Sequence, residues 1–331
     1  IVANGTLNGD GYTVTDLHID RGGESEVGLF ASTSGGAVVE NVVLEDASVM
    51  GQDAVGGLVG HNEGEVRDAR VTGNVTGVGD TSTGGVVGRN VGGVVTRSSS
   101  SADVVGNRYV GGVVGRNTGE VSLSYADGTV RGDDTLAGVV GYNLGTVRDS
   151  YSKVDAEGRV TVAGVVGRNR GRAVIRNTYA AGNHRGTTEI RGLVAANSAT
   201  VEGSYYDKSS VTQASDPRSD PGGTELATDD MVGERARQTM TALDFDETWE
   251  TVTNPNDYPV LAWQTEDMPV LDGGDDGEDG DGSETDDGSD DGDGTDGDEG
   301  DSDGVDDGDA DVGGGTEGTD NGTDDTENGT D

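Results

Sequence analysis

Histidine and cysteine supply much of the acid–base, nucleophilic and metal chemistry of proteins, and this chain is poor in both. It has three histidines, His18, His61 and His184, which lie far apart in the sequence, and it has no cysteine. The lack of cysteine excludes thiol catalysis and cysteine-bound metal ions. Histidines so scattered do not predict a Ser-His-Asp triad or a metal cluster. We therefore expect no metal site and no cofactor.

Carboxylates are abundant, and enzymes that cleave polysaccharides gather several of them in one cleft. The residues that could form such a cleft are Asp68, Arg70, Asp127 and Asp149. No acidic position recurs between neighbouring units of the repeat described below, so these side chains are not expected to converge. A carbohydrate-active enzyme is thus an alternative to the non-catalytic function that the sequence favours.

One variable position carries mostly basic or aromatic side chains, and it directly precedes a recurrent asparagine. It holds His61, Arg89, Arg116, Tyr142 and Arg168. In stacked repeats, Arg89, Arg116 and Arg168 would form a surface stripe able to bind anionic glycans. The alternative is that these arginines pair with neighbouring carboxylates such as Glu120.

The elements that position these residues are repeats. GGVVGRN occurs at 84–90 and at 111–117, and close variants occur at 56–62, 137–143 and 163–169. The glycine before the apolar pair recurs every 26 to 29 residues, at Gly28, Gly57, Gly85, Gly112, Gly138, Gly164 and Gly192. Each unit contains three short Val-rich strands and three turns, too few strands for a propeller blade and the wrong composition for helical repeats. The sequence predicts an all-β, right-handed parallel β-helix of about seven coils, stacked about 4.8 Å apart.

Two turn positions recur with the same period. Five residues after the reference glycine stand Asn62, Asn90, Asn117, Asn143, Asn169 and Asn197, and only the first unit differs, with Thr33. In register these asparagines would form a hydrogen-bonded ladder with a structural role. Seven residues after the reference glycine stand Gly35, Gly64, Gly92, Gly119, Gly145 and Gly171, where we expect a corner with positive φ.

The motif G-G-[LV]-V-G-x-N-x-G-x-[VI] resembles the GLUG repeat family of bacterial and archaeal surface proteins. GTLNGDGYTVTDLHID at 5–20 resembles the segment before the first repeat in such proteins, and DETWETVTNPNDYPVLAWQ at 246–264 resembles their closing segment. The resemblance covers about residues 5–264. It implies a β-helical rod at the cell surface, adhesin-like or part of a larger protease-bearing chain, and it implies no catalytic residues.

The chain divides into three segments. Residues 1–212 are expected to form the β-helix, with a lead-in at 1–26 and repeats at 27–212. Residues 213–271 are expected to form a helix-plus-strand cap, with a helix near 228–243 and both tryptophans, Trp249 and Trp263, in a lid over the last coil. The tail, 272–331, holds 27 of the 64 acidic residues and no Lys or Arg. It is expected to be a disordered stalk with loose cation binding only.

The net charge of −43 excludes nucleic acid as a partner, and no apolar run is long enough to span a membrane. Acidic excess with only two lysines is typical of proteins adapted to high salt. The sequons Asn4, Asn74, Asn321 and Asn328 would accept glycans in an exported protein. We therefore expect an extracellular or cell-surface glycoprotein with an adhesive or structural role toward surface glycans or proteins. A spacer module of a larger protein or protease remains an alternative.

Overall fold

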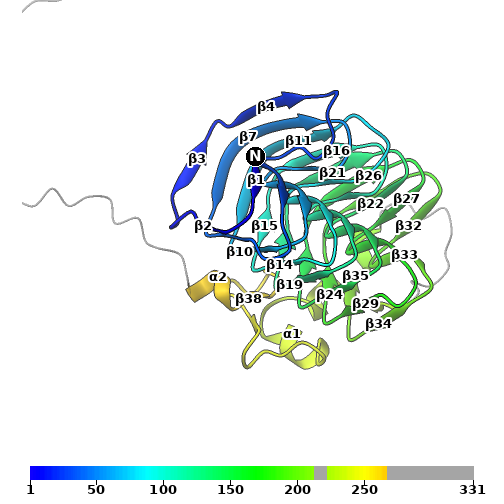
Figure 1. Ribbon diagram of the computed structural model, residues 1–331. Coiled ribbons are helices and arrows are strands. Elements are labelled where there is room, and N and C mark those ends of the chain that lie inside the picture. The colour runs from blue at the N-terminus through cyan, green and yellow to red at the C-terminus, as the bar shows by residue number, and fades with distance from the viewer. Residues whose placement is uncertain (212–221, 267–331) are drawn as a thin grey trace, which may run out of the picture. The chain divides into compact units, whose positions relative to one another are not determined.

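The computed structural model describes residues 1–211 and 222–266, and these residues fold as a parallel β-helix (Figure 1). They belong to one compact unit, residues 1–271. The prediction of an all-β parallel β-helix is confirmed. The predicted tail at 272–331 lies outside the described residues, as do 212–221 and 267–271 of the predicted cap.

Four parallel sheets run along the coils. Sheet A contains β1 (Val2–Ala3), β5 (Phe30–Thr33), β9 (Val59–Asn62), β13 (Val87–Asn90), β18 (Val114–Asn117), β23 (Val140–Asn143), β28 (Val166–Asn169) and β33 (Val194–Asn197). Sheet B contains β2 (Thr6–Asn8), β6 (Val38–Glu40), β10 (Glu65–Arg67), β14 (Val94–Thr96), β19 (Glu120–Ser122), β24 (Thr146–Arg148), β29 (Val174–Arg176) and β34 (Thr200–Glu202). The lead-in supplies the first strand of both sheets, so they have eight strands where the repeats alone give about seven coils.

The other two sheets close each coil. Sheet C contains β3 (Thr13–Thr15), β4 (His18–Arg21), β7 (Val43–Gly51), β11 (Arg70–Gly77), β15 (Ser99–Ser100), β16 (Asp103–Gly106), β20 (Tyr125–Ala126), β21 (Thr129–Gly132), β25 (Tyr151–Ser152), β26 (Asp155–Gly158), β30 (Tyr179–Ala180), β31 (His184–Arg185), β35 (Tyr205–Asp207) and β36 (Thr224–Leu226). Sheet D contains β8 (Val55–Gly56), β12 (Thr83–Gly84), β17 (Val110–Gly111), β22 (Thr135–Ala137), β27 (Thr161–Ala163) and β32 (Glu189–Arg191). A central coil therefore has five short strands, β13 to β17 for example, where the sequence pattern predicted three.

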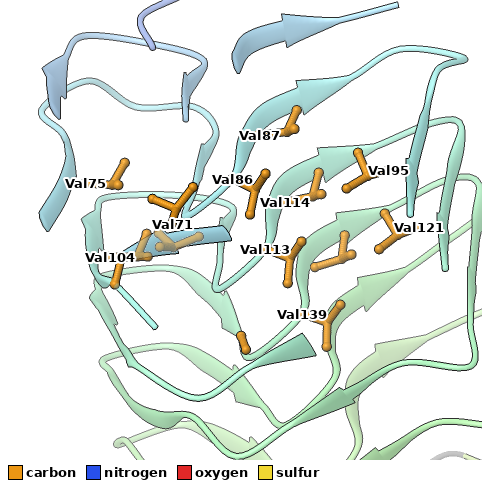
Figure 2. Packing of buried hydrophobic residues seen from close by; sticks show 14 of the residues in the cluster. Val71, Val75, Val86, Val87, Val95, Val104, Val113, Val114, Val121 and Val139 are labelled. Carbon is orange, nitrogen blue, oxygen red and sulfur yellow. The ribbon is translucent and has the colours of Figure 1, made fainter. Parts of the chain in front are cut away.

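Columns of valine fill the interior of the coils. Val87 and Val114 are register partners, as are Val95 and Val121, and all four are fully buried (Figure 2). Each valine therefore packs on the valine at the same position of the next coil. Burying one such side chain stabilises the fold by roughly 1.5 to 3 kcal/mol.

Glycine is required where backbones of neighbouring coils approach closely. A Cβ at Gly112 would lie 2.1 Å from the carbonyl oxygen of Gly138, and a Cβ at Gly119 would lie 2.0 Å from that of Gly93. The predicted positive φ at the corner glycines is wrong except at Gly92 and Gly171, where φ is 69° and 71°. The turns that contain Gly92 and Gly171 are longer than the turn that contains Gly119. In the first of them, the next residue, Gly93, occupies the position that Gly119 has in the shorter turn.

Left-handed backbone occurs instead at a corner that the sequence did not reveal. This corner follows sheet B and is occupied mostly by residues other than glycine: Asn41, Asp68, Arg97, Leu123, Asp149, Asn177 and Gly203. Asn and Asp tolerate this conformation better than other side chains. Leu123 does not share that tolerance, and its carbonyl oxygen accepts a hydrogen bond from Trp263 Nε1 at 3.0 Å.

The segment after the last coil lies along the side of the coils. It contains the 3-10 turn η2 (Thr228–Asp230), α1 (Gly233–Thr239), the antiparallel strands β37 (Trp249–Glu250) and β38 (Val260–Leu261), and α2 (Trp263–Glu266). Figure 1 shows α1, β38 and α2 beside the coils. The predicted helix at 228–243 is shorter than expected, because Gly233 has a φ of 54°, which separates η2 from α1.

This side segment, residues 228–266, is not a lid over the last coil. Its Trp249 packs between Tyr151 and Tyr179, whose rings are 6.0 and 5.5 Å away. The last coil is instead followed by β36, which pairs with β35, after the turn η1 (Lys208–Ser210). No helix in residues 1–211 or 222–266 is long and apolar enough to cross a membrane.

Candidate functional site

The recurrent asparagines form a continuous chain of side-chain hydrogen bonds at the turn after sheet A. Asn90 Nδ2 donates to Asn117 Oδ1 at 2.8 Å, and Asn117 Nδ2 donates to Asn143 Oδ1 at 2.9 Å. The chain continues in both directions, from Thr33 Oγ1, which donates to Asn62, to Asn197, which accepts from Asn169. Asn62, Asn90, Asn117, Asn143 and Asn169 are fully buried. A ligand in solvent therefore cannot reach these amides.

A second ladder lies beside the left-handed corner, and the sequence analysis missed it. The backbone N–H of Ser98 donates to Ser124 Oγ, and that of Ser124 donates to Ser150 Oγ, both at 3.2 Å. Thr178 and Ser204 continue it. The signal in the sequence was a hydroxyl residue directly before a tyrosine in four successive units, at Tyr125, Tyr151, Tyr179 and Tyr205.

These tyrosines form a stacked column on the outside of sheet C, under the side segment. The rings of Tyr125 and Tyr151 are 5.0 Å apart and nearly parallel, as are those of Tyr151 and Tyr179. Burial raises the pKa of Tyr151 and of Tyr179 well above the usual value. Tyr179 donates to the carbonyl oxygen of Pro259 at 2.5 Å. The column is therefore an internal packing surface, and its rings are not available as a sugar platform.

The basic and aromatic position before each asparagine faces outward from sheet A. Strand pairing places His61, Arg89, Arg116, Tyr142 and Arg168 at the same place in consecutive coils. We call these five residues the sheet A row. All are partly exposed. The structure thus brings Arg89 and Arg116 side by side and separates Arg168 from them by Tyr142.

Carboxylates hold both ends of the sheet A row. His61 Nδ1 lies 3.3 Å from Glu26 and its Nε2 lies 3.4 Å from Glu63. At the other end, Arg168 Nη2 donates to Asp134 Oδ1 at 3.1 Å. Glu120, the expected partner of the row, pairs with Arg148 instead, at 2.7 Å.

A hollow of about 330 Å³ opens beside His61 and is lined by Glu26, Ser32, Ser34 and Glu63. It contains the residue types of a serine hydrolase. However, both ring nitrogens of His61 face carboxylates, so neither nitrogen is directed at a serine hydroxyl.

The carboxylates considered for polysaccharide cleavage do not converge. Asp68 and Asp149 occupy the same corner but stand three coils apart, about 14 Å at the usual strand spacing. Paired glycosidase carboxylates are about 5 to 9.5 Å apart. Asp68 is bound to Arg97 at 2.7 Å, and Asp149 accepts from Arg148 at 2.9 Å. Asp127 accepts from Ser101, and Arg70 lies in the coil of Asp68.

The other two histidines lie apart from His61, with His18 exposed in β4 and His184 inside the coils. His184 lies in the interior column that continues Val104, Val130 and Ala156, and it is fully buried. Burial lowers the pKa of His184 to about 4. Across residues 1–211 and 222–266, no group of three or more His, Asp or Glu side chains is arranged to hold a metal ion.

Two of the four sequons can be located. Asn4 lies near the start of the first coil, and Asn74 lies in β11; both are exposed. Asn321 and Asn328 lie outside the described residues.

Comparison with known proteins agrees with this geometry. A family model of the GLUG motif matches residues 51–76 and 106–131. The chain carries GLUG repeats. Each matched segment begins at the end of one coil, passes through sheet A and ends in the following coil. The ladder asparagine of sheet A also occurs in the coil between the two matched segments and in the coils after the second.

One relative and one solved structure extend the comparison. Over 266 residues, 79% of this chain, the sequence is 34% identical to Halomucin of Haloquadratum walsbyi, of which it spans only 3%. A crystal structure from Bacteroides ovatus, described as a candidate immunoglobulin A1 protease, matches with a TM-score of 0.52. That match covers 77% of this chain and 76% of the other at 18% identity, which shows a shared fold.

Proposed function

We propose that this chain is a non-catalytic GLUG-repeat rod of an extracellular or cell-surface protein, with an adhesive or structural role. The observation that carries the proposal is that the recurrent residues are buried in the solenoid. Each coil is joined to the next by the hydrogen bonds of the asparagine and serine ladders and by packing in the valine columns. The repeated residues therefore stabilise a stiff, extended surface.

Three further observations support a surface location. The similarity to Halomucin covers most of the described chain. The sequons Asn4 and Asn74 are exposed and could accept glycans. The acidic composition, with a net charge of −43, suits a protein that works in concentrated salt, where repulsion between carboxylates is screened. The tail at 272–331 would then be an acidic stalk that binds cations loosely.

Limited proteolysis in molar salt tests the rod. We expect a protected fragment that ends near residue 265, because the side segment is bonded to four coils. Cleavage throughout the repeats at an equal rate would contradict the proposal. Incubation with polysaccharides tests the lack of catalysis, since release of reducing or unsaturated ends would show an enzyme.

A second candidate function is a spacer module. It is favoured by the fold shared with the Bacteroides ovatus protein described as a candidate protease. In that case the rod would hold a catalytic domain of a longer chain at a distance from its anchor. Purified rod would then retain no glycan or surface protein, whereas an adhesive rod would retain its ligand.

A further inference from the structure

The centre of the sheet A row carries positive charge that nothing in the described chain neutralises. Among residues 1–211 and 222–266, neither Arg89 nor Arg116 has a carboxylate within ion-pair distance, and Nε of each is buried without a hydrogen-bond partner. By contrast, the flanking His61 and Arg168 are held by carboxylates. Two adjacent unneutralised guanidinium groups are unexpected in a chain with 64 acidic residues.

The residues of the neighbouring coils show why Arg89 and Arg116 have no carboxylate partner among the described residues. The corner that precedes sheet D in one coil lies against the sheet A row of the next coil. It places Glu26 against His61 and Asp134 against Arg168. Strand pairing gives Ala54 and Ser82 the corner position that Glu26 has, so neither Arg89 nor Arg116 meets a carboxylate at that position. Asp134 stands one position before that corner residue, where the corresponding residues are Asp53 and Thr81. Asp53 accepts a hydrogen bond from Thr81 and forms no ion pair with Arg89 in the described part of the chain.

An aromatic surface lies directly beside the unneutralised pair. The rings of Tyr109 and Tyr142 are stacked at 4.8 Å, and the guanidinium of Arg116 lies 5.7 Å from the Tyr142 ring. The guanidinium of Arg108 lies 4.8 Å from Tyr109. Unlike the tyrosine column of sheet C, these rings are not covered by the side segment, whose aromatic contacts are all to that column.

We propose that Arg89, Arg116, Tyr109 and Tyr142 form a binding site for an anionic polysaccharide that lies along the axis of the coils. The two guanidinium groups, one coil apart, would each bind a carboxylate or sulfate of the glycan through paired N–H donors. The tyrosine pair would carry the apolar face of the adjoining sugar ring. The proposal rests on the adhesive role above and names the ligand of that role.

The charge of the whole chain sets the conditions for binding. Carboxylates elsewhere on the protein repel a polyanion at low salt, where the Debye length is about 10 Å at 0.1 M. At about 1 M it falls to about 3 Å, so the distant repulsion is screened and the direct contacts remain. We therefore expect affinity to rise with salt up to the molar range, the reverse of ordinary polyanion binding.

The test uses the full chain in molar KCl with fluorescent oligosaccharides, followed by anisotropy. The probes are oligogalacturonate, sulfated dextran oligomer, neutral dextran oligomer and single-stranded oligonucleotide. We expect one or both anionic sugars to bind and neutral dextran to bind at least about tenfold more weakly, because charge-assisted hydrogen bonds would be missing. The two anionic probes distinguish a carboxylate ligand from a sulfate ligand.

Two charge-matched double variants locate the site. Arg89→Gln with Arg116→Gln should weaken binding of the anionic sugar at least about tenfold. Arg131→Gln with Arg185→Gln removes the same charge from two exposed positions on sheet C and should leave affinity within about twofold. Tyr142→Leu should weaken sugar binding and should lower the free energy of unfolding by no more than about 1.5 kcal/mol, about tenfold in the unfolding equilibrium, which is the contribution of one aromatic stack.

Several outcomes would overturn the proposal. They are failure of both anionic sugars to bind, equal losses in the two double variants, or binding of the oligonucleotide as tight as that of the sugars. Released reducing ends, measured in the same samples, would instead contradict the non-catalytic function. A sample with neither binding nor release would contradict only the site proposed here.

Discussion

Removal of one amide from the middle of the asparagine ladder should destabilise the β-helix far more than removal of one at its end. Asn117 is the central test position. Its Nδ2 donates to Asn143 Oδ1 and to the carbonyl oxygens of Gly119 and Thr146, and its Oδ1 accepts from Asn90 Nδ2 and from the N–H of Gly119.

The expected magnitude follows from what each partner keeps in Asn117→Ala. Asn90 Nδ2 still donates to the carbonyl oxygen of Gly93, and Asn143 Oδ1 still accepts from the N–H of Gly145. The two ladder bonds are lost, at about 1 kcal/mol each, and the half-buried N–H of Gly119 is left without this acceptor, at about 1 to 3 kcal/mol. We therefore expect a loss of about 3 to 5 kcal/mol in the free energy of unfolding.

Asn197→Ala is the matched control. Asn197 is half-buried at the end of the ladder, where it accepts from Asn169 Nδ2 and from the N–H of Ala199. The ladder bond to Asn169 is lost there, and because Asn197 is half-buried, water can reach the groups that remain. The expected cost is about 1 to 2 kcal/mol.

Equilibrium urea unfolding at constant molar KCl measures both losses, provided that the denaturant slope is unchanged between variants. Hydrogen exchange should locate the effect of Asn117→Ala in the coils on either side of it. Equal costs for the two variants, or a cost below about 1 kcal/mol for Asn117→Ala, would refute the ladder as a source of stability.

Three further predictions test separate parts of the fold. For His184, burial lowers the pKa from 6.5 to about 4, so between these values the unfolded chain binds a proton that the folded chain does not. The free energy of unfolding should therefore fall by roughly 3 kcal/mol as the pH drops from 6.5 to 4, and His184→Gln should remove that slope; identical pH profiles for the two proteins would contradict the burial argument. Gly138→Ala should cost about 1 to 3 kcal/mol or more by urea unfolding, since the new Cβ would lie 2.3 Å from the carbonyl oxygen of Gly164. Gly5→Ala, with no atom within 4 Å, should cost little, and equal losses would argue against close backbone approach. Trp249→Ala should cost about 3 to 5 kcal/mol and make the side segment sensitive to protease while the coils stay protected; simultaneous digestion of both would contradict this.

Much of the fold could be predicted because the coils repeat. The period of the reference glycines indicated a β-helix, and the apolar pairs indicated the valine columns. The corner glycines were identified as necessary, but for the wrong reason. Gly119 is needed because the backbone of Gly93 is close, and a sequence read one unit at a time does not contain that distance.

Less of the candidate site could be predicted. The row of His61, Arg89, Arg116, Tyr142 and Arg168 is visible in the sequence, yet all of its basic members look alike there. Whether an arginine is neutralised depends on the corner residue of the preceding coil, about one coil earlier in the chain. Asp134 reaches Arg168 in this way, whereas its counterpart in the coil before Arg89, Asp53, accepts from Thr81 instead. Among the described residues, Arg89 and Arg116 have no such partner.

The sequence by itself determined which residues of neighbouring coils lie side by side. In a parallel stack with a nearly constant period, residue i meets its counterpart in the next unit, so periodicity alone specifies the Asn117–Asn143 contact and the valine columns. Only the tertiary structure decided where the side segment packs, because Trp249 and Trp263 occur once and have no counterpart to fix their register. Their place is set by the shape of the tyrosine column and by single contacts such as that between Trp263 Nε1 and Leu123, which no repeat pattern encodes.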